Sequence, residues 1–126
     1  MSGREGSPHP FAYYSSGRWL LSQLYVVGWA ANGVIKIGVT ANGRERYGPF
    51  LARGAELLML NSYRPGDTVN EESRLAGVLS GHWPSAFGSK EEAAPLLGKR
   101  GAGWMECYRV PVNEWGKVLD SLREEE

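Results

Sequence analysis

The chain has 126 residues, 14 cationic and 14 acidic side chains, and a single cysteine. This length fits one domain, and the lone Cys107 excludes an internal disulfide. The most apolar stretch, residues 19–31, is shorter than the ~20 residues that span a bilayer, so we expect a cytoplasmic protein that does not enter a membrane. A neutral total also argues against binding nucleic acid through bulk charge.

The charge is unevenly distributed along the chain. Residues 1–55 contain six cationic and two acidic side chains, a surplus of +4, and residues 56–126 carry −4. A local basic face is therefore compatible with the neutral total.

Residues 1–18 are expected to form a flexible arm, because glycine, serine and proline dominate there, and residues 19–126 a single domain. In that domain, residues 24–29 and 34–39 are β-branched or aromatic runs separated by Asn-Gly, which predicts a β-hairpin. Residues 55–63 are predicted to be a third strand. We therefore expect an α/β domain of the α+β type, with a small central antiparallel three-stranded sheet flanked by helices.

Other segments carry helix or strand signals. A short helix is predicted for residues 42–53, and a second one for residues 68–80, which begin with the capping-box pair Thr68 and Glu71. The remaining predictions are a short helix starting at the Ser89/Glu92 box, a fourth strand or edge segment at 104–110, and an amphipathic C-terminal helix at 113–123.

The two faces of the predicted hairpin differ in chemistry. If partner numbers sum to 63 or 65, one face is wholly apolar and the other combines Tyr25, Lys36 and Thr40 around Gly38. Glycine lets another molecule approach the backbone closely. We expect this second face to meet a ligand, with Trp29 on the same face stacking on a base.

Glu72 interrupts the apolar face of the second predicted helix. Its neighbours at helical spacing include Leu75 and Leu79. Burying an unpaired carboxylate costs several kcal/mol or raises its pKa, so Glu72 is a functional candidate on physical grounds.

Tyr25, Lys36, Arg46 and Glu72 supply a proton-transfer group, two cations and a hard oxygen ligand, which metal-assisted phosphodiester hydrolysis requires. Their order, with separations of eleven and ten residues between the first three, resembles the GIY-YIG nuclease superfamily. The resemblance is closest to the phage-associated branch of the superfamily, in which the second motif begins Lys-Ile-Gly. The segments that carry it are Leu24-Tyr25-Val26, Lys36-Ile37-Gly38-Val39-Thr40, Arg46, Glu72 and Glu106-Cys107-Tyr108. The resemblance covers about residues 23–110.

This resemblance implies a metal-dependent DNA endonuclease with a single active site. Glu72 would bind Mg²⁺ or Mn²⁺, Arg46 would neutralise the scissile phosphate, and either Tyr25 or Lys36 would be the general base. Arg44, in the same predicted helix as Arg46, is the rival for its role. The residues expected to contact substrate are Trp29, Gly38, Thr40, Arg44 and Arg53.

Two other functions fit parts of the sequence. The first is a catalytically inactive GIY-YIG-like module that binds DNA or protein. The neutral charge favours this module, or a domain that relies on a DNA-binding partner protein or a fused DNA-binding segment for affinity. A nuclease with one site that cuts both strands would have to form a homodimer or cut twice. The second is a small regulatory protein that contacts its partner through Phe11, Tyr13 and Tyr14. We also expect Glu106 to pair with Arg109 or Lys99, and His82 to be a cation at a helix C-terminus.

Overall fold

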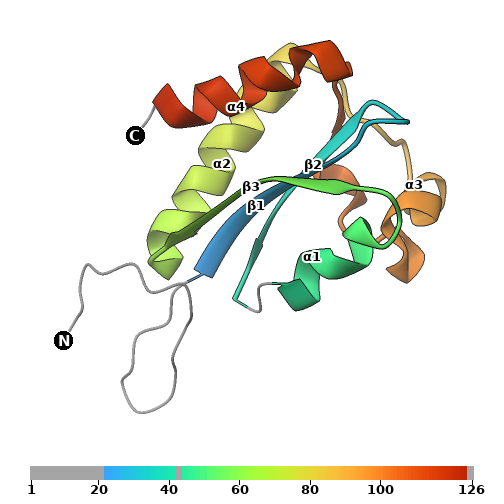
Figure 1. The fold of residues 1–126 in the computed structure, drawn as a ribbon, viewed down its shortest axis with the longest axis horizontal. Coiled ribbons are helices and arrows are strands. Elements are labelled where there is room, and N and C mark those ends of the chain that lie inside the picture. Colours follow the sequence, from blue (N-terminus) through green and yellow to red (C-terminus); the bar gives the residue numbers. More distant parts are fainter. Residues whose placement is uncertain (1–21, 42–43, 125–126) are drawn as a thin grey trace.

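The computed structural model describes residues 22–41 and 44–124, and within them four strands form one antiparallel sheet with helices on both faces (Figure 1). The strand order is β3-β1-β2-β4. The strands are β1 (Ser22–Trp29), β2 (Val34–Thr40), β3 (Glu56–Tyr63) and β4 (Cys107–Arg109). The sheet therefore has one strand more than the three expected from the sequence. The additional strand is β4, which lies in the segment expected to be a fourth strand or an edge, and it pairs with β2. The predicted arm at residues 1–18 lies outside the described residues.

The β1–β2 hairpin forms as predicted. Its register runs from Gln23↔Thr40 to Trp29↔Val34, so partner numbers sum to 63. Gly33 makes the turn possible, because its φ of 65° lies in the left-handed region and its N–H donates to the Trp29 carbonyl at 2.9 Å.

The main helices are α1 (Arg44–Leu51), α2 (Pro65–His82), α3 (Lys90–Leu97) and α4 (Trp115–Glu124). The capping box expected at Thr68 is wrong, because α2 begins three residues earlier, at Pro65. Proline suits the first helical position, where its missing N–H needs no partner. Thr68 is buried inside the helix instead and donates to the Arg64 carbonyl at 3.0 Å. The box at Ser89 is confirmed, since the Ser89 hydroxyl accepts from the Glu92 N–H at 3.2 Å.

Both faces of the sheet are buried. Alternate residues of β1 and β2 point to opposite sides, so the hairpin supplies two cores. Helices α2 and α4 cover one face and α1 and α3 the other (Figure 1). The core on the α2/α4 side includes Val26, Ile35, Ile37, Leu75, Leu79 and Val118, and that on the α1/α3 side includes Tyr25, Val27, Trp29, Val34, Phe50 and Leu97.

The hairpin face expected to meet a ligand is thus an interior face. Tyr47 and Phe50 of α1, with Ala93 and Leu97 of α3, cover it. Helix α1 contains Gly48 and Pro49, which weakened its helical signal in the sequence and hid this apolar side.

Candidate functional site

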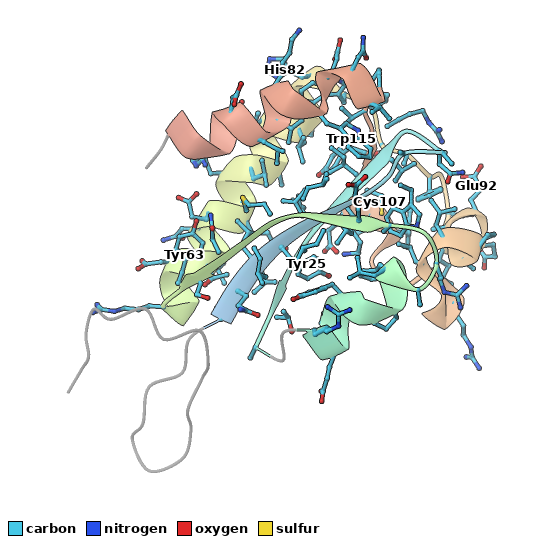
Figure 2. The ribbon with its side chains drawn as sticks, in the orientation of Figure 1. Tyr25, Tyr63, His82, Glu92, Cys107 and Trp115 are labelled. Atoms are coloured by element: carbon cyan, nitrogen blue, oxygen red, sulfur yellow. The ribbon has the colours of Figure 1, made fainter. Side chains whose placement is uncertain are left out.

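Tyr25 and Lys36 meet on the α1/α3 side of the hairpin, and both side chains are buried, with exposures of 0% and 1%. The Lys36 ammonium nitrogen lies 3.4 Å from the Tyr25 hydroxyl and 5.4 Å from the centre of its ring. Figure 2 shows Tyr25 between the sheet and α1, where its ring contacts Tyr47 and Phe50. Two polar groups predicted from the sequence to share a site are therefore in contact.

Gly38 makes this contact possible. It is the β1–β2 partner of Tyr25, and a Cβ at this position would overlap the Tyr25 ring and hydroxyl. The glycine expected to admit a ligand to the backbone thus admits the tyrosine ring.

Lys36 lies opposite the residue at which β4 begins. Pairing between β2 and β4 ends at Lys36↔Cys107, and the carbonyl of the next residue, Ile37, accepts a hydrogen bond from Lys36 at 3.1 Å. The third acceptor is Glu106 Oε1 at 3.4 Å. An ammonium has three N–H donors and no acceptor, so these three oxygens match its full donor capacity.

Glu106 pairs with Lys36 rather than with Arg109 as expected; the Lys99 side chain lies outside the described atoms. The guanidinium of Arg109 donates to the Ala86 carbonyl at 2.7 Å instead. Glu106 ends the short 3-10 segment Trp104–Glu106, immediately before the β4 residue that pairs with Lys36. Its side chain is 47% exposed, so it links the buried ammonium to solvent.

Glu72 lies on α2, the helix that covers the opposite face of the sheet from Tyr25. Burial raises the pKa of its carboxyl group above the ordinary value of 4.5, Glu106 raises the pKa further, and Lys36 acts in the opposite direction. The Glu72 charge is therefore within electrostatic range of both partners. We refer to Tyr25, Lys36, Glu72 and Glu106 together as the edge site.

Arg44 and Arg46 are exposed in α1 and form no ion pair within residues 22–41 and 44–124. Arg46 precedes Phe50 by one helical turn on the same side of α1. The Phe50 ring lies 5.5 Å from the Lys36 ammonium.

Arg53 has a different environment. Its guanidinium donates to the Pro95 carbonyl at 3.5 Å and lies over Gly98, where a Cβ would be 2.8 Å from its Nε. It therefore contacts the C-terminal end of α3, where a cation is favourable for the helix dipole. This contact gives Arg53, expected to bind substrate, a structural role.

Two other residues expected to contact substrate are buried. The Trp29 indole is 2% exposed and packs edge-on against Phe50 at 5.9 Å. It cannot stack on a base without leaving the core, so the expectation that it faces a ligand is wrong. Thr40 is 7% exposed at the end of β2. Helices α1 and α3 cover the face that these predictions assumed to be open.

Glu72, the predicted metal ligand, has the carboxylate of Glu106 within electrostatic range. The described residues hold no group of three or more His, Cys, Asp or Glu side chains that could enclose an ion. Mg²⁺ and Mn²⁺ prefer oxygen donors, and Mg²⁺ is usually held by one or two carboxylates together with waters and substrate phosphates. Glu72 could supply one such carboxylate, and Glu106 is within electrostatic range of it.

Cys107 lies beside the edge site, but its thiol is expected to be unreactive. Burial raises the pKa of its thiol to about 12. Because the thiolate is the nucleophilic form, Cys107 is protonated and unreactive at neutral pH.

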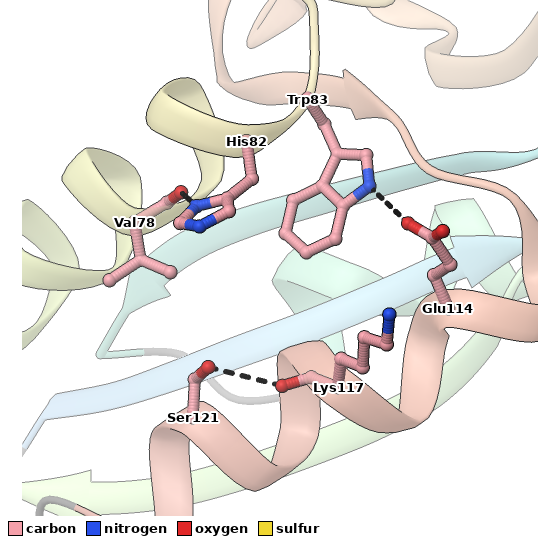
Figure 3. Close-up of a pocket in the computed structure, with 6 residues that line it drawn as sticks. All are labelled: Val78, His82, Trp83, Glu114, Lys117 and Ser121. Atoms are coloured by element: carbon pink, nitrogen blue, oxygen red, sulfur yellow. Dashed lines mark hydrogen bonds between the residues drawn. The ribbon is translucent and has the colours of Figure 1, made fainter.

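A separate pocket of about 310 Å³ lies between α2 and α4 (Figure 3). Its polar groups are largely bonded to one another: the Trp83 indole N–H donates to Glu114 at 2.8 Å, and His82 Nδ1 lies 3.0 Å from the Val78 carbonyl. His82 is exposed in the last turn of α2, where the sequence placed it. None of the edge-site residues lines this pocket.

Among the described helices, none has both the length and the apolar composition that crossing a bilayer requires. Comparisons of the chain with protein-family models, with curated proteins and with solved structures found no match.

Proposed function

We propose that this chain is a metal-dependent DNA endonuclease of the GIY-YIG type that hydrolyses phosphodiester bonds at the edge site. The observation that supports the proposal best is the contact between the Lys36 ammonium and the Tyr25 hydroxyl, with the Glu72 carboxylate in electrostatic range. A proton-transfer group and a cation are thus in contact, and a hard oxygen ligand on a third element is within electrostatic range of the cation.

The hydrogen bonds suggest separate roles for the two candidate bases. The Lys36 nitrogen lies within hydrogen-bond distance of three oxygens, an environment that suits an ammonium with three N–H donors. Tyr25 accepts one of these bonds through its hydroxyl oxygen. We therefore assign Tyr25, in its phenolate form, as the base that would take the proton from the attacking water, and Lys36 as the cation that would stabilise the phenolate charge.

The other roles follow from charge and exposure. Glu72 would hold Mg²⁺ or Mn²⁺, and the bound ion would polarise a phosphoryl oxygen. Arg46, exposed in α1, would neutralise charge that develops on the scissile phosphate.

The test is nicking of supercoiled plasmid in the presence of Mg²⁺ or Mn²⁺. Removing a general base lowers a rate by about 10²- to 10⁴-fold, so Tyr25→Phe is expected to fall in this range and Glu72→Ala to reach background. Glu71→Ala is the matched control, because Glu71 is the adjacent carboxylate and, within the described part of the chain, pairs with Arg74 of the same helix at 3.0 Å. Undiminished nicking by Glu72→Ala, or no nicking by the wild type, would overturn the proposal.

One observation favours the alternative, a catalytically inactive module that binds DNA or protein. Tyr25 and Lys36 are almost fully buried, whereas reacting groups must reach substrate. DNA binding without cleavage, weakened by Arg46→Ala and by salt, would support this alternative over the nuclease.

A further inference from the structure

Of the three acceptors around the Lys36 ammonium, one is exposed. Tyr25 and Ile37 are both 0% exposed, and the Glu106 side chain is 47% exposed. Glu106 is therefore the neighbour of Lys36 that solvent, or a ligand in solution, reaches first.

The rest of the lysine is tightly covered. The aromatic rings of Tyr25 and Phe50 lie 5.4 and 5.5 Å from the ammonium nitrogen. Gly103, with a φ of 90°, packs on the lysine stem so closely that a Cβ there would be 2.8 Å from Lys36 Cε. These contacts leave the Glu106 side as the route to the ammonium group.

We propose that Lys36 is a binding site for a phosphate group of the substrate, and that the Glu106 carboxylate occupies this site in the free protein until the phosphate displaces it. The inference rests on the proposed function in one respect, namely that the phosphate belongs to DNA.

The chemistry of the two anions supports the exchange. Carboxylate and phosphate oxygens accept the same charge-assisted hydrogen bond from an ammonium group, and such bonds are ordinarily about 2.7–2.9 Å long. The Lys36–Glu106 distance of 3.4 Å is longer than this, and an ion pair with a half-exposed partner is weak. Within the described residues Glu106 makes no other ion pair, so rotation of its side chain is enough to release Lys36.

The exchange also explains how a buried lysine can bind a phosphate group. Desolvation of Lys36 is already complete, and the displaced Glu106 moves into solvent, where its charge is hydrated. If the Lys36–Glu106 ion pair were purely structural, removing the Glu106 charge would lower the stability of the protein and would not strengthen DNA binding.

The experiment measures binding of a fluorescein-labelled DNA duplex by anisotropy, in EDTA so that no cleavage takes place. Glu106→Gln is expected to bind about three- to fivefold more tightly than the wild type, which corresponds to the loss of a weak competing ion pair. Glu91→Gln is the matched control, since it removes the same charge from an exposed glutamate of α3 and is expected to change affinity much less. The gain must vanish in the double variant Glu106→Gln/Lys36→Met.

A second measurement does not depend on that double variant folding. Inorganic phosphate is titrated into protein labelled with ¹⁵N at lysine side chains, and the Lys36 ammonium signal is followed. The signal of Glu106→Gln is expected to shift at a lower phosphate concentration than that of the wild type.

Equal or weaker DNA binding by Glu106→Gln, or a Lys36 signal that ignores phosphate, would overturn the exchange. Failure of the nuclease proposal is recognised separately in the plasmid assay. Tighter binding by Glu106→Gln together with no nicking by any variant supports the phosphate site and contradicts the endonuclease.

Discussion

The ring of Tyr25 crosses the backbone of β2 at Gly38, and a single added methyl group at Gly38 would overlap the tyrosine hydroxyl. Glycine is therefore needed at position 38 to make room for Tyr25 in the edge site, and not to form the turn or the strand. The hydrogen bond between Tyr25 and Lys36 depends on it.

Gly38→Ala is therefore expected to destabilise the protein by about 1–3 kcal/mol, the usual cost of overpacking a core. The free energy of unfolding in urea measures this loss. Gly77→Ala is the control, because a Cβ at Gly77 in α2 would meet nothing within 4 Å and alanine improves helix stability by up to ~1 kcal/mol. Equal stability of Gly38→Ala and wild type would contradict the placement of Tyr25.

Glu72 is expected to make stability fall as pH rises. Its pKa is raised in the folded state, so between the unfolded and folded pKa values the native protein binds more protons than the unfolded chain. Glu72→Gln should thus be more stable than the wild type at pH 7, and this advantage should disappear as pH drops below 4.5, the ordinary value for glutamate. Urea midpoints between pH 4 and pH 8, measured without metal, test the trend. A loss of stability in Glu72→Gln at pH 7 would mean that the carboxylate makes a favourable bond there.

Cys107 is expected to resist alkylation in the folded protein. Its pKa of about 12 leaves almost no thiolate at pH 8, and the side chain is buried. Iodoacetamide at pH 8 should leave the native protein unmodified and label it rapidly in urea, as mass spectrometry would show. Because the chain has one cysteine, any labelling reports on this position. Rapid labelling under native conditions would mean that β4 opens readily.

Arg46 and Arg53 are expected to respond differently to truncation. Arg46→Ala should weaken DNA binding and reduce its salt dependence while leaving stability within about 0.5 kcal/mol, because the side chain is exposed. Arg53→Ala should leave DNA binding nearly unchanged and reduce the protection of α3 amides from hydrogen exchange, because it removes the contacts with Pro95 and Gly98. The reverse pattern would assign the phosphate contact to Arg53.

Local signals in the sequence predicted the hairpin and the third strand well. Asn-Gly fixed the turn, and alternation of β-branched residues fixed which side chains share a face. The start of α2 was missed because Thr68 resembles a cap, whereas Pro65 begins the helix and Thr68 is needed inside it as the acceptor of the Ser22 hydroxyl at 2.6 Å. Such a tertiary contact has no local sequence signature.

The edge site was only partly predictable for the same reason. The order and spacing of Tyr25, Lys36 and Glu72 were enough to suggest that these residues share a site. The pairing of Glu106 with Lys36 instead of Arg109 could not be predicted, because this contact spans 70 residues and depends on the register between β2 and β4. Burial of Trp29 depends on α1, whose amphipathic pattern is weak around Gly48 and Pro49.

The two cores share the same two strands, and this has a consequence for how the protein unfolds. Val26 and Val27 are adjacent in β1, yet each belongs to a different core. Neither half of the molecule can melt while leaving the hairpin intact for the other half. Calorimetry should accordingly record a single cooperative transition, with equal calorimetric and van't Hoff enthalpies.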